Sequence, residues 1–120
     1  MITLEDAKRA LHEAVEEKGA DYVYPRAGLT CTYAEADGSP SCIVGHVLYK
    51  LDPKVYEAVA LIESTEESFS VGEIETTIDK DVFADRDVIH FLGAAQARQD
   101  HGATWGEAEA TALDVIKGED

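Results

Sequence analysis

"SPSCIVGHVLYKL", residues 39–51, decides the fold that we expect, because it predicts a short apolar helix in the middle of the chain. Ser39 suits an N-cap, and Pro40 suits the first helical position. Cys42 then lies in the first turn, and His46 lies one turn later on the same face. Gly45 lowers the helix propensity of this stretch and predicts close packing against another element.

The residues before this helix predict an N-terminal helix and a β-hairpin. Thr3 and Asp6 form a pattern close to a capping box, and apolar residues at helical spacing follow until Gly19. Residues 22–24 and 29–33 are rich in aromatic and β-branched side chains and flank a break at residues 25–28. This pattern is typical of two short strands joined by a turn.

The residues after the central helix predict further helices. Pro53 starts a new helix at once, and Ser70 with Glu73 favours a short helix, with strands as the alternative in that region. Two more helices follow, and a capping box of Thr104 and Glu107 begins the last of them. We expect these two to form an αα-hairpin.

The expected fold class is therefore α+β. We expect one mainly helical domain over residues 1–117, with a short antiparallel β-hairpin and a C-terminal αα-hairpin. The last residues, 118–120, are expected to form a frayed tail.

The chain is strongly acidic, with 25 acidic and 10 basic residues and a net charge of −15. Such a charge repels phosphate backbones and anionic membranes, which argues against direct nucleic-acid binding. Residues 57–87 hold ten acidic residues against Lys80 and Arg86, a local balance of −8. This region is a solvated surface, a contact site for a basic protein, or an imitation of DNA phosphates. The candidate partner-binding residues are Glu63, Glu66, Glu67, Glu73, Glu75, Asp79 and Asp81.

The cysteine count and the N-terminal residues indicate a cytoplasmic protein. The two cysteines form no CxxC pair, and the first residues lack the layout of a signal peptide. No apolar run approaches the roughly 18 residues that a membrane helix needs. We therefore expect a cytoplasmic protein without a membrane partner.

Cys42 and His46 allow three interpretations. A thiol near a helix N-terminus can become a nucleophile, with His46 as its base, in a cysteine-based enzyme or redox protein. The same pair, with Cys31, could hold zinc in a zinc-stabilised module. The favoured interpretation is that both side chains are packed in the core, so we expect neither catalysis nor a metal or other cofactor.

A second dense stretch, "AQARQDHGATWGEA" at residues 95–108, predicts a structural corner. Gln99 and Asp100 lie on the last turn of one helix, and Thr104 begins the next. Trp105 is expected to fill the space between the two helices. The polar groups are expected to satisfy the backbone at this tight connection.

Together, "CTYAEADGSPSCIVGHVLYKL" and "AQARQDHGATWGEA" resemble a family of small proteins from actinobacteria and their phages. The matching positions are Cys42, Ile43, Val44, Gly45, His46, Gln99, Asp100, Gly102, Thr104, Trp105 and Gly106. The resemblance implies a phage or host origin and no established activity. We therefore expect a non-enzymatic, acidic protein-binding domain, present as a monomer or a homodimer. In a phage it would be an accessory protein that contacts a basic protein of the bacterial host.

Overall fold

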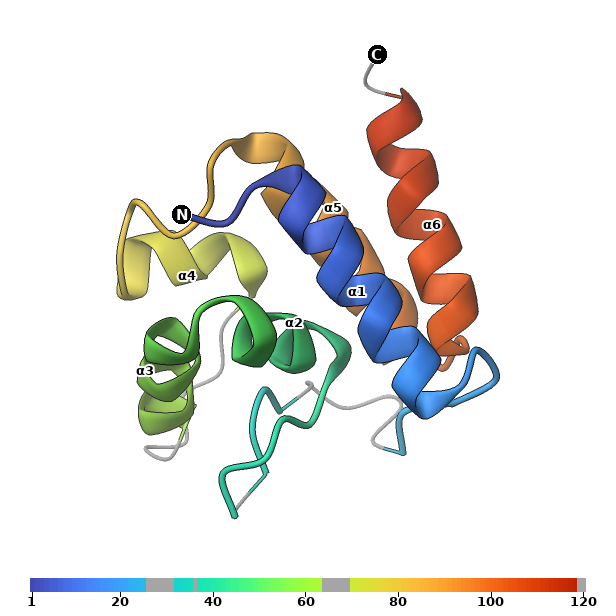
Figure 1. The fold of residues 1–120 in the computed structure, drawn as a ribbon, viewed down its shortest axis with the longest axis horizontal. Helices are drawn as coiled ribbons and strands as arrows, with labels where there is room; N and C mark the ends of the chain where they lie inside the picture. Colours follow the sequence, from blue (N-terminus) through green and yellow to red (C-terminus); the bar gives the residue numbers. More distant parts are fainter. Residues whose placement is uncertain (26–31, 36, 64–69, 119–120) are drawn as a thin grey trace.

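The computed structural model describes residues 1–25, 32–35, 37–63 and 70–118. These residues form the helices α1 (Leu4–Lys18), α2 (Ile43–Leu51), α3 (Pro53–Glu63), α4 (Val71–Thr77), α5 (Arg86–Asp100) and α6 (Trp105–Gly118). Figure 1 shows α2 in the middle of the molecule, with α3 and α4 on one side and α1, α5 and α6 on the other. Among the described residues the arrangement is helical, without a sheet.

The first helix confirms its sequence signals. The side chain of Thr3 accepts a hydrogen bond from the backbone N–H of Asp6 at 3.1 Å. At the other end, Gly19 adopts a φ of 98°, which an L side chain rarely tolerates. The apolar stripe between these ends faces the core, as the spacing predicts.

The predicted α+β class is wrong, because the described residues contain no β-hairpin. Val23 forms only an isolated bridge with Thr104, and residues 26–31, which include most of the second predicted strand, lie outside the described residues. The backbone groups expected to pair between strands serve helix N-termini instead. The carbonyl of Tyr22 accepts from the N–H of Trp105 at 2.8 Å, and that of Thr32 accepts from the N–H of Cys42 at 3.0 Å.

The central helix begins later than its sequence predicts. Asp37 accepts hydrogen bonds from the N–H and the hydroxyl of Ser39, at 3.0 and 2.6 Å, and holds it in a turn. Pro40 forms an isolated bridge with Ala34. Cys42 is therefore the N-cap, and its sulfur accepts from the N–H of Gly45 at 3.4 Å.

The start of α2 is buried and depends on α5. All residues from Ile43 to Leu48 are buried, so the helix cannot use water to satisfy its first N–H groups. The side-chain oxygen of Gln99, which is fully buried, accepts from the N–H of Ile43 at 2.8 Å. The predicted C-terminal pair of helices thereby holds the central helix in place (Figure 1).

The remaining helices start at local caps. The backbone N–H of Ser70 donates to Glu73 at 2.9 Å, so the favoured short helix is present as α4. The N–H of Glu107 donates to the hydroxyl of Thr104 at 3.1 Å, and the carboxylate of Glu107 accepts in return from the N–H of Thr104 at 2.9 Å. This reciprocal pair confirms the capping box that begins α6.

Replacing Gln99 by leucine should lower the free energy of unfolding by about 1–3 kcal/mol, because it leaves the buried N–H of Ile43 without its acceptor. Urea denaturation measures this loss, and amide exchange at Ile43 should become faster. An unchanged unfolding midpoint together with unchanged exchange would contradict this role of Gln99.

Candidate functional site

Cys42 and His46 are buried beside each other in the core. Cys42 is 0% exposed and His46 is 8% exposed. The Nδ1 of His46 donates to the backbone carbonyl of Cys42 at 3.0 Å, and its ring lies edge-on to Trp105 with the ring centres 5.2 Å apart. Burial lowers the pKa of His46, so the imidazole is held neutral. A thiol at this depth cannot reach a substrate in the folded protein, so the geometry does not favour a nucleophile.

The described residues bring together two of the predicted zinc ligands, Cys42 and His46, without a third. Cys31 lies outside those residues, and within them no three His, Cys, Asp or Glu side chains form a cluster. Another histidine, His12, lies between α1 and α6, where its Nδ1 is 3.0 Å from the carboxylate of Glu109. That carboxylate raises the pKa of His12 and favours the charged imidazolium.

The residues predicted to form the corner between α5 and α6 have partners other than those expected, since Gln99 caps α2, Thr104 pairs with Glu107, and Trp105 contacts Tyr22 and His46. The side-chain oxygen of Gln99 accepts from the N–H of Ile43 at the start of α2, and its side-chain NH2 group donates to the carboxylate of Asp100 at 3.1 Å. Burial raises the pKa of Asp100. Trp105 is fully buried, edge-on to Tyr22, and its Nε1 has no hydrogen-bond partner within the described part of the chain. These contacts give the corner a role in holding helices together.

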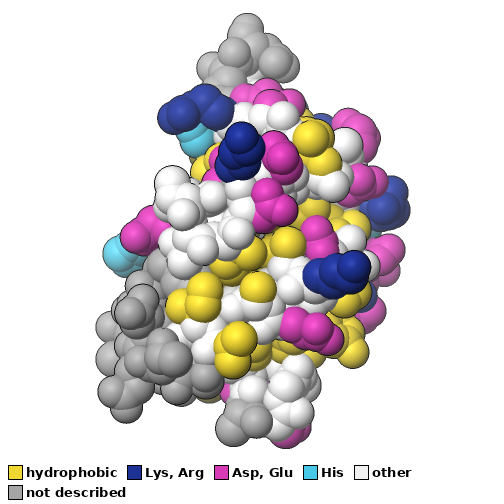
Figure 2. All heavy atoms as spheres, turned by 90° about the vertical axis from the view of Figure 1, so that its left-hand side faces the viewer, with side chains coloured by type: hydrophobic (Ala, Val, Ile, Leu, Met, Phe, Trp, Pro, Cys, Tyr) yellow, Lys and Arg dark blue, Asp and Glu magenta, His cyan; other side chains and the backbone are white. Residues whose placement is uncertain are grey.

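The candidate partner-binding acids come from α3, α4 and the loop after α4. Glu66 and Glu67 lie outside the described residues, and the other five are Glu63, Glu73, Glu75, Asp79 and Asp81. Figure 2 views the molecule from the side of α3 and α4 and shows acidic side chains around a group of hydrophobic ones. The face therefore offers apolar contact area as well as charge.

Several of these acids also cap backbone N–H groups, a role that the sequence analysis missed. Glu73 caps α4 through Ser70, as described above, and Asp79 accepts from the N–H of Asp81 at 2.9 Å. Glu75 accepts a longer bond, of 3.4 Å, from the segment that precedes α5. Their charges remain, but replacing them would also disturb the local structure.

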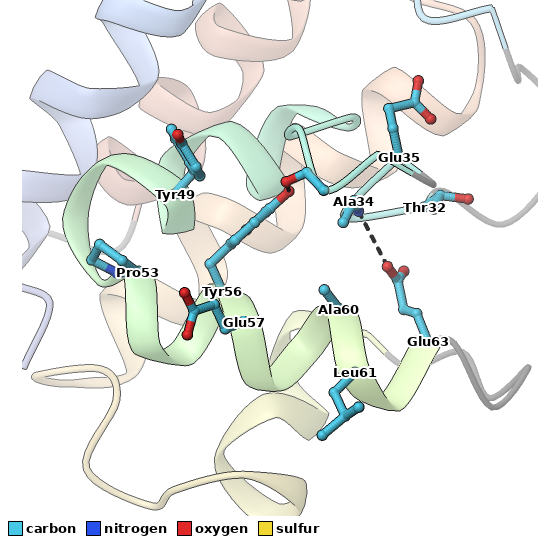
Figure 3. A pocket seen from close by; sticks show the side chains of 11 residues that line it. Thr32, Ala34, Glu35, Tyr49, Pro53, Tyr56, Glu57, Ala60, Leu61 and Glu63 are labelled. Carbon is cyan, nitrogen blue, oxygen red and sulfur yellow. Dashed lines mark hydrogen bonds between the residues drawn. The ribbon is translucent and has the colours of Figure 1, made fainter.

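A pocket of about 610 Å³ opens between α3 and the segment before α2 that contains Thr32, Ala34, Glu35 and Gly38. We call it the α3 pocket (Figure 3). Its lining residues are Thr32, Ala34, Glu35, Gly38, Tyr49, Pro53, Tyr56, Glu57, Ala60, Leu61 and Glu63. The volume is within the range of roughly 300–1,000 Å³ that is typical of ligand pockets. It is therefore a candidate binding cavity in the described part of the molecule.

Glu63 holds the two walls of the α3 pocket together. From the end of α3, its carboxylate accepts hydrogen bonds from the backbone N–H groups of Tyr33 at 2.8 Å and Ala34 at 3.2 Å. Tyr56 makes a second link, since its hydroxyl donates to the carbonyl of Gly38 at 2.7 Å. Burial is the main cause that raises the pKa of Tyr56 to about 12, so this hydroxyl keeps its proton at neutral pH.

The α3 pocket combines apolar surface with negative charge. Leu61 is 71% exposed and Tyr49 is 51% exposed, so both side chains offer apolar surface that a partner can contact. Three carboxylates, those of Glu35, Glu57 and Glu63, line the same pocket, and its described lining includes no lysine or arginine. The sequence analysis missed the pocket. The available signal was that Leu61 lies off the face of α3 that carries its buried residues, Val55, Tyr56 and Val59.

No family model, curated protein or solved structure matches this chain. The functional proposal therefore rests on the geometry of the site, and the resemblance to actinobacterial and phage proteins stays a prediction. In the described ranges, no helix is long and apolar enough to cross a membrane.

Replacing Glu63 by glutamine should lower the free energy of unfolding by about 1–3 kcal/mol, because a neutral amide binds the N–H groups of Tyr33 and Ala34 more weakly. Urea denaturation measures the change. Glu57→Gln is the matched control, since Glu57 is an exposed acid on the same helix, and it should change stability by no more than about 0.5 kcal/mol. Equal effects of the two substitutions would contradict the role of Glu63.

Proposed function

We propose that this protein is a small acidic binding domain, without catalytic activity of its own, that recognises a basic segment of another protein. The observation that carries the proposal is the α3 pocket, in which exposed apolar side chains lie beside three carboxylates. Apolar area supplies affinity, and charges around it select the partner and speed the encounter.

The interior of the protein supports a binding function over catalysis. The cysteine and histidine that could form a reactive pair are both packed in the core, at the N-terminal end of α2. The charge of the whole molecule supports a basic partner, because a net charge of −15 attracts positively charged surfaces over a distance set by the salt concentration.

We further propose that the partner is a basic protein of a bacterial host. This part of the proposal comes from the two motifs that resemble proteins of actinobacteria and their phages. A phage accessory protein with an acidic pocket could engage a host protein without any reaction. Its effect would then depend on occupancy, and so on the concentrations of the two proteins and on salt.

A random peptide library displayed on a carrier and selected on the immobilised protein tests this proposal. We expect the selected peptides to combine basic and apolar residues. Their affinity should fall steeply between about 0.01 M and about 1 M salt, because the Debye length shrinks from about 30 Å to about 3 Å. Selection of peptides without net positive charge, or an affinity that does not change with salt concentration, would contradict the proposal.

A further inference from the structure

We infer that the α3 pocket binds an arginine side chain of the partner, together with the apolar residue next to it. This inference rests on the proposed function and names what the pocket recognises. Its basis is the presence of acidic residues on both walls of a pocket whose remaining lining is largely apolar and aromatic (Figure 3).

The apolar lining suits the stem of a long side chain. Tyr56 and Ala60 come from α3 and face the pocket, and Leu61 stands exposed on the same helix. Arginine buries its methylene groups on such surfaces while its charged end remains near polar groups. The exposed Leu61 can then contact an apolar neighbour of the arginine.

Acidic residues lie on both walls of the pocket. Figure 3 shows Glu57 on α3 and Glu35 on the opposite wall, with the carboxylate of Glu35 directed away from α3. Glu57 therefore supplies the nearer charge for a cation, unpaired among the described residues, and Glu35 adds to the negative field around the pocket. Glu63 adds a third negative charge at the end of α3, although its oxygens already accept the N–H groups of the facing segment. A planar guanidinium can donate two parallel hydrogen bonds to one carboxylate, such as that of Glu57.

The aromatic groups favour arginine over lysine. Tyr49 is half exposed and lies edge-on to Tyr56, with ring centres 5.1 Å apart, and the hydrogen bond to Gly38 fixes the ring of Tyr56. A guanidinium stacks on aromatic faces and is less strongly hydrated than an ammonium. A guanidinium therefore loses less hydration free energy than an ammonium when it enters a pocket of this kind.

The charge argues against a second copy of this chain as the occupant. Each copy carries a net charge of −15, and the pocket itself carries carboxylates. Two such surfaces repel each other, and like charges across an interface cost binding energy. Complementarity therefore favours a basic segment of a different protein.

Chemical-shift titration of the isotope-labelled protein tests the inference with short, capped peptides. The probe is Gly-Leu-Arg-Leu-Gly, and its matched control carries citrulline, a neutral near-isostere of arginine. We expect the arginine peptide to shift the amide signals of Glu35, Tyr49, Glu57, Ala60 and Leu61. The citrulline peptide should bind about tenfold more weakly or worse, because it lacks charge-assisted hydrogen bonds. A lysine peptide should bind more weakly than the arginine peptide.

Two variants separate the pocket from the overall charge. Glu57→Gln should weaken binding of the arginine peptide about two- to fivefold, as expected for a partly exposed ion pair. Glu13→Gln removes the same charge from an exposed position on α1 and should leave the affinity within experimental error.

A third variant tests the apolar contact. Leu61→Ala should weaken binding of the arginine peptide but not binding of a peptide in which both leucines are replaced by glycine.

Several results would overturn the inference. Equal binding of the citrulline peptide, equal effects of the Glu57 and Glu13 variants, or shifts confined to another face would each do so. If basic peptides from the library bind elsewhere, recognition of a basic segment stands, but its assignment to the α3 pocket and the arginine inference both fail. If no basic peptide binds at all, the proposed function and the arginine inference both fail. Shifts of the pocket residues on concentrating the protein alone would identify a second copy as the occupant.

Discussion

The backbone of Tyr33 is held from both sides, and the α3 pocket depends on this. Its carbonyl accepts from the N–H of Ser41 at 3.0 Å, next to the start of α2, while its own N–H donates to Glu63 at the end of α3. Gly45 allows the close approach, because a Cβ at that position would overlap the carbonyl oxygen of Tyr33. One short segment thus joins two helices and forms a wall of the pocket.

The same region connects the pocket to the rest of the fold. The start of α2 is fixed by Gln99 of α5, and Trp105 at the start of α6 packs against His46 of α2. The residues that seemed suited to chemistry are therefore the ones that position α2. Their polar atoms bind backbone groups that burial would otherwise leave unsatisfied. The proposed recognition surface is the acidic and apolar face formed around α3.

The sequence predicted the features whose cause is local. Thr3 and Thr104 cap helices through bonds to residues three positions away, and such caps can be recognised in a short window. The predicted start of α2 was too early in the chain. Ser39 is bonded to Asp37 in a turn and does not cap the helix, so Cys42 takes the N-cap position. The prediction of a hairpin was wrong because of contacts between residues eight to ten positions apart. The carbonyls of Thr32 and Tyr33 accept from the N–H groups of Cys42 and Ser41, and the alternation of side chains along a predicted strand does not reveal such partners.

The pocket could not be predicted, because its walls come from distant parts of the sequence. Glu63 binds Tyr33 across thirty positions, and Tyr56 binds Gly38 across eighteen. The acidic region 57–87 contains Glu57 and Glu63 of the pocket but not Glu35 or Tyr49, which lie before it in the chain. Several acids within it cap backbone groups instead, as Glu73 and Asp79 do.

Native-state amide exchange of Tyr33 and Ala34 tests most directly whether Glu63 builds the pocket. Both N–H groups donate to the carboxylate of Glu63, so we predict exchange rates close to those of the buried α2 amides, such as that of Leu48. Exchange of Tyr33 and Ala34 as fast as that of an unstructured peptide, with Leu48 protected, would show that the wall is not held and would contradict the proposed site.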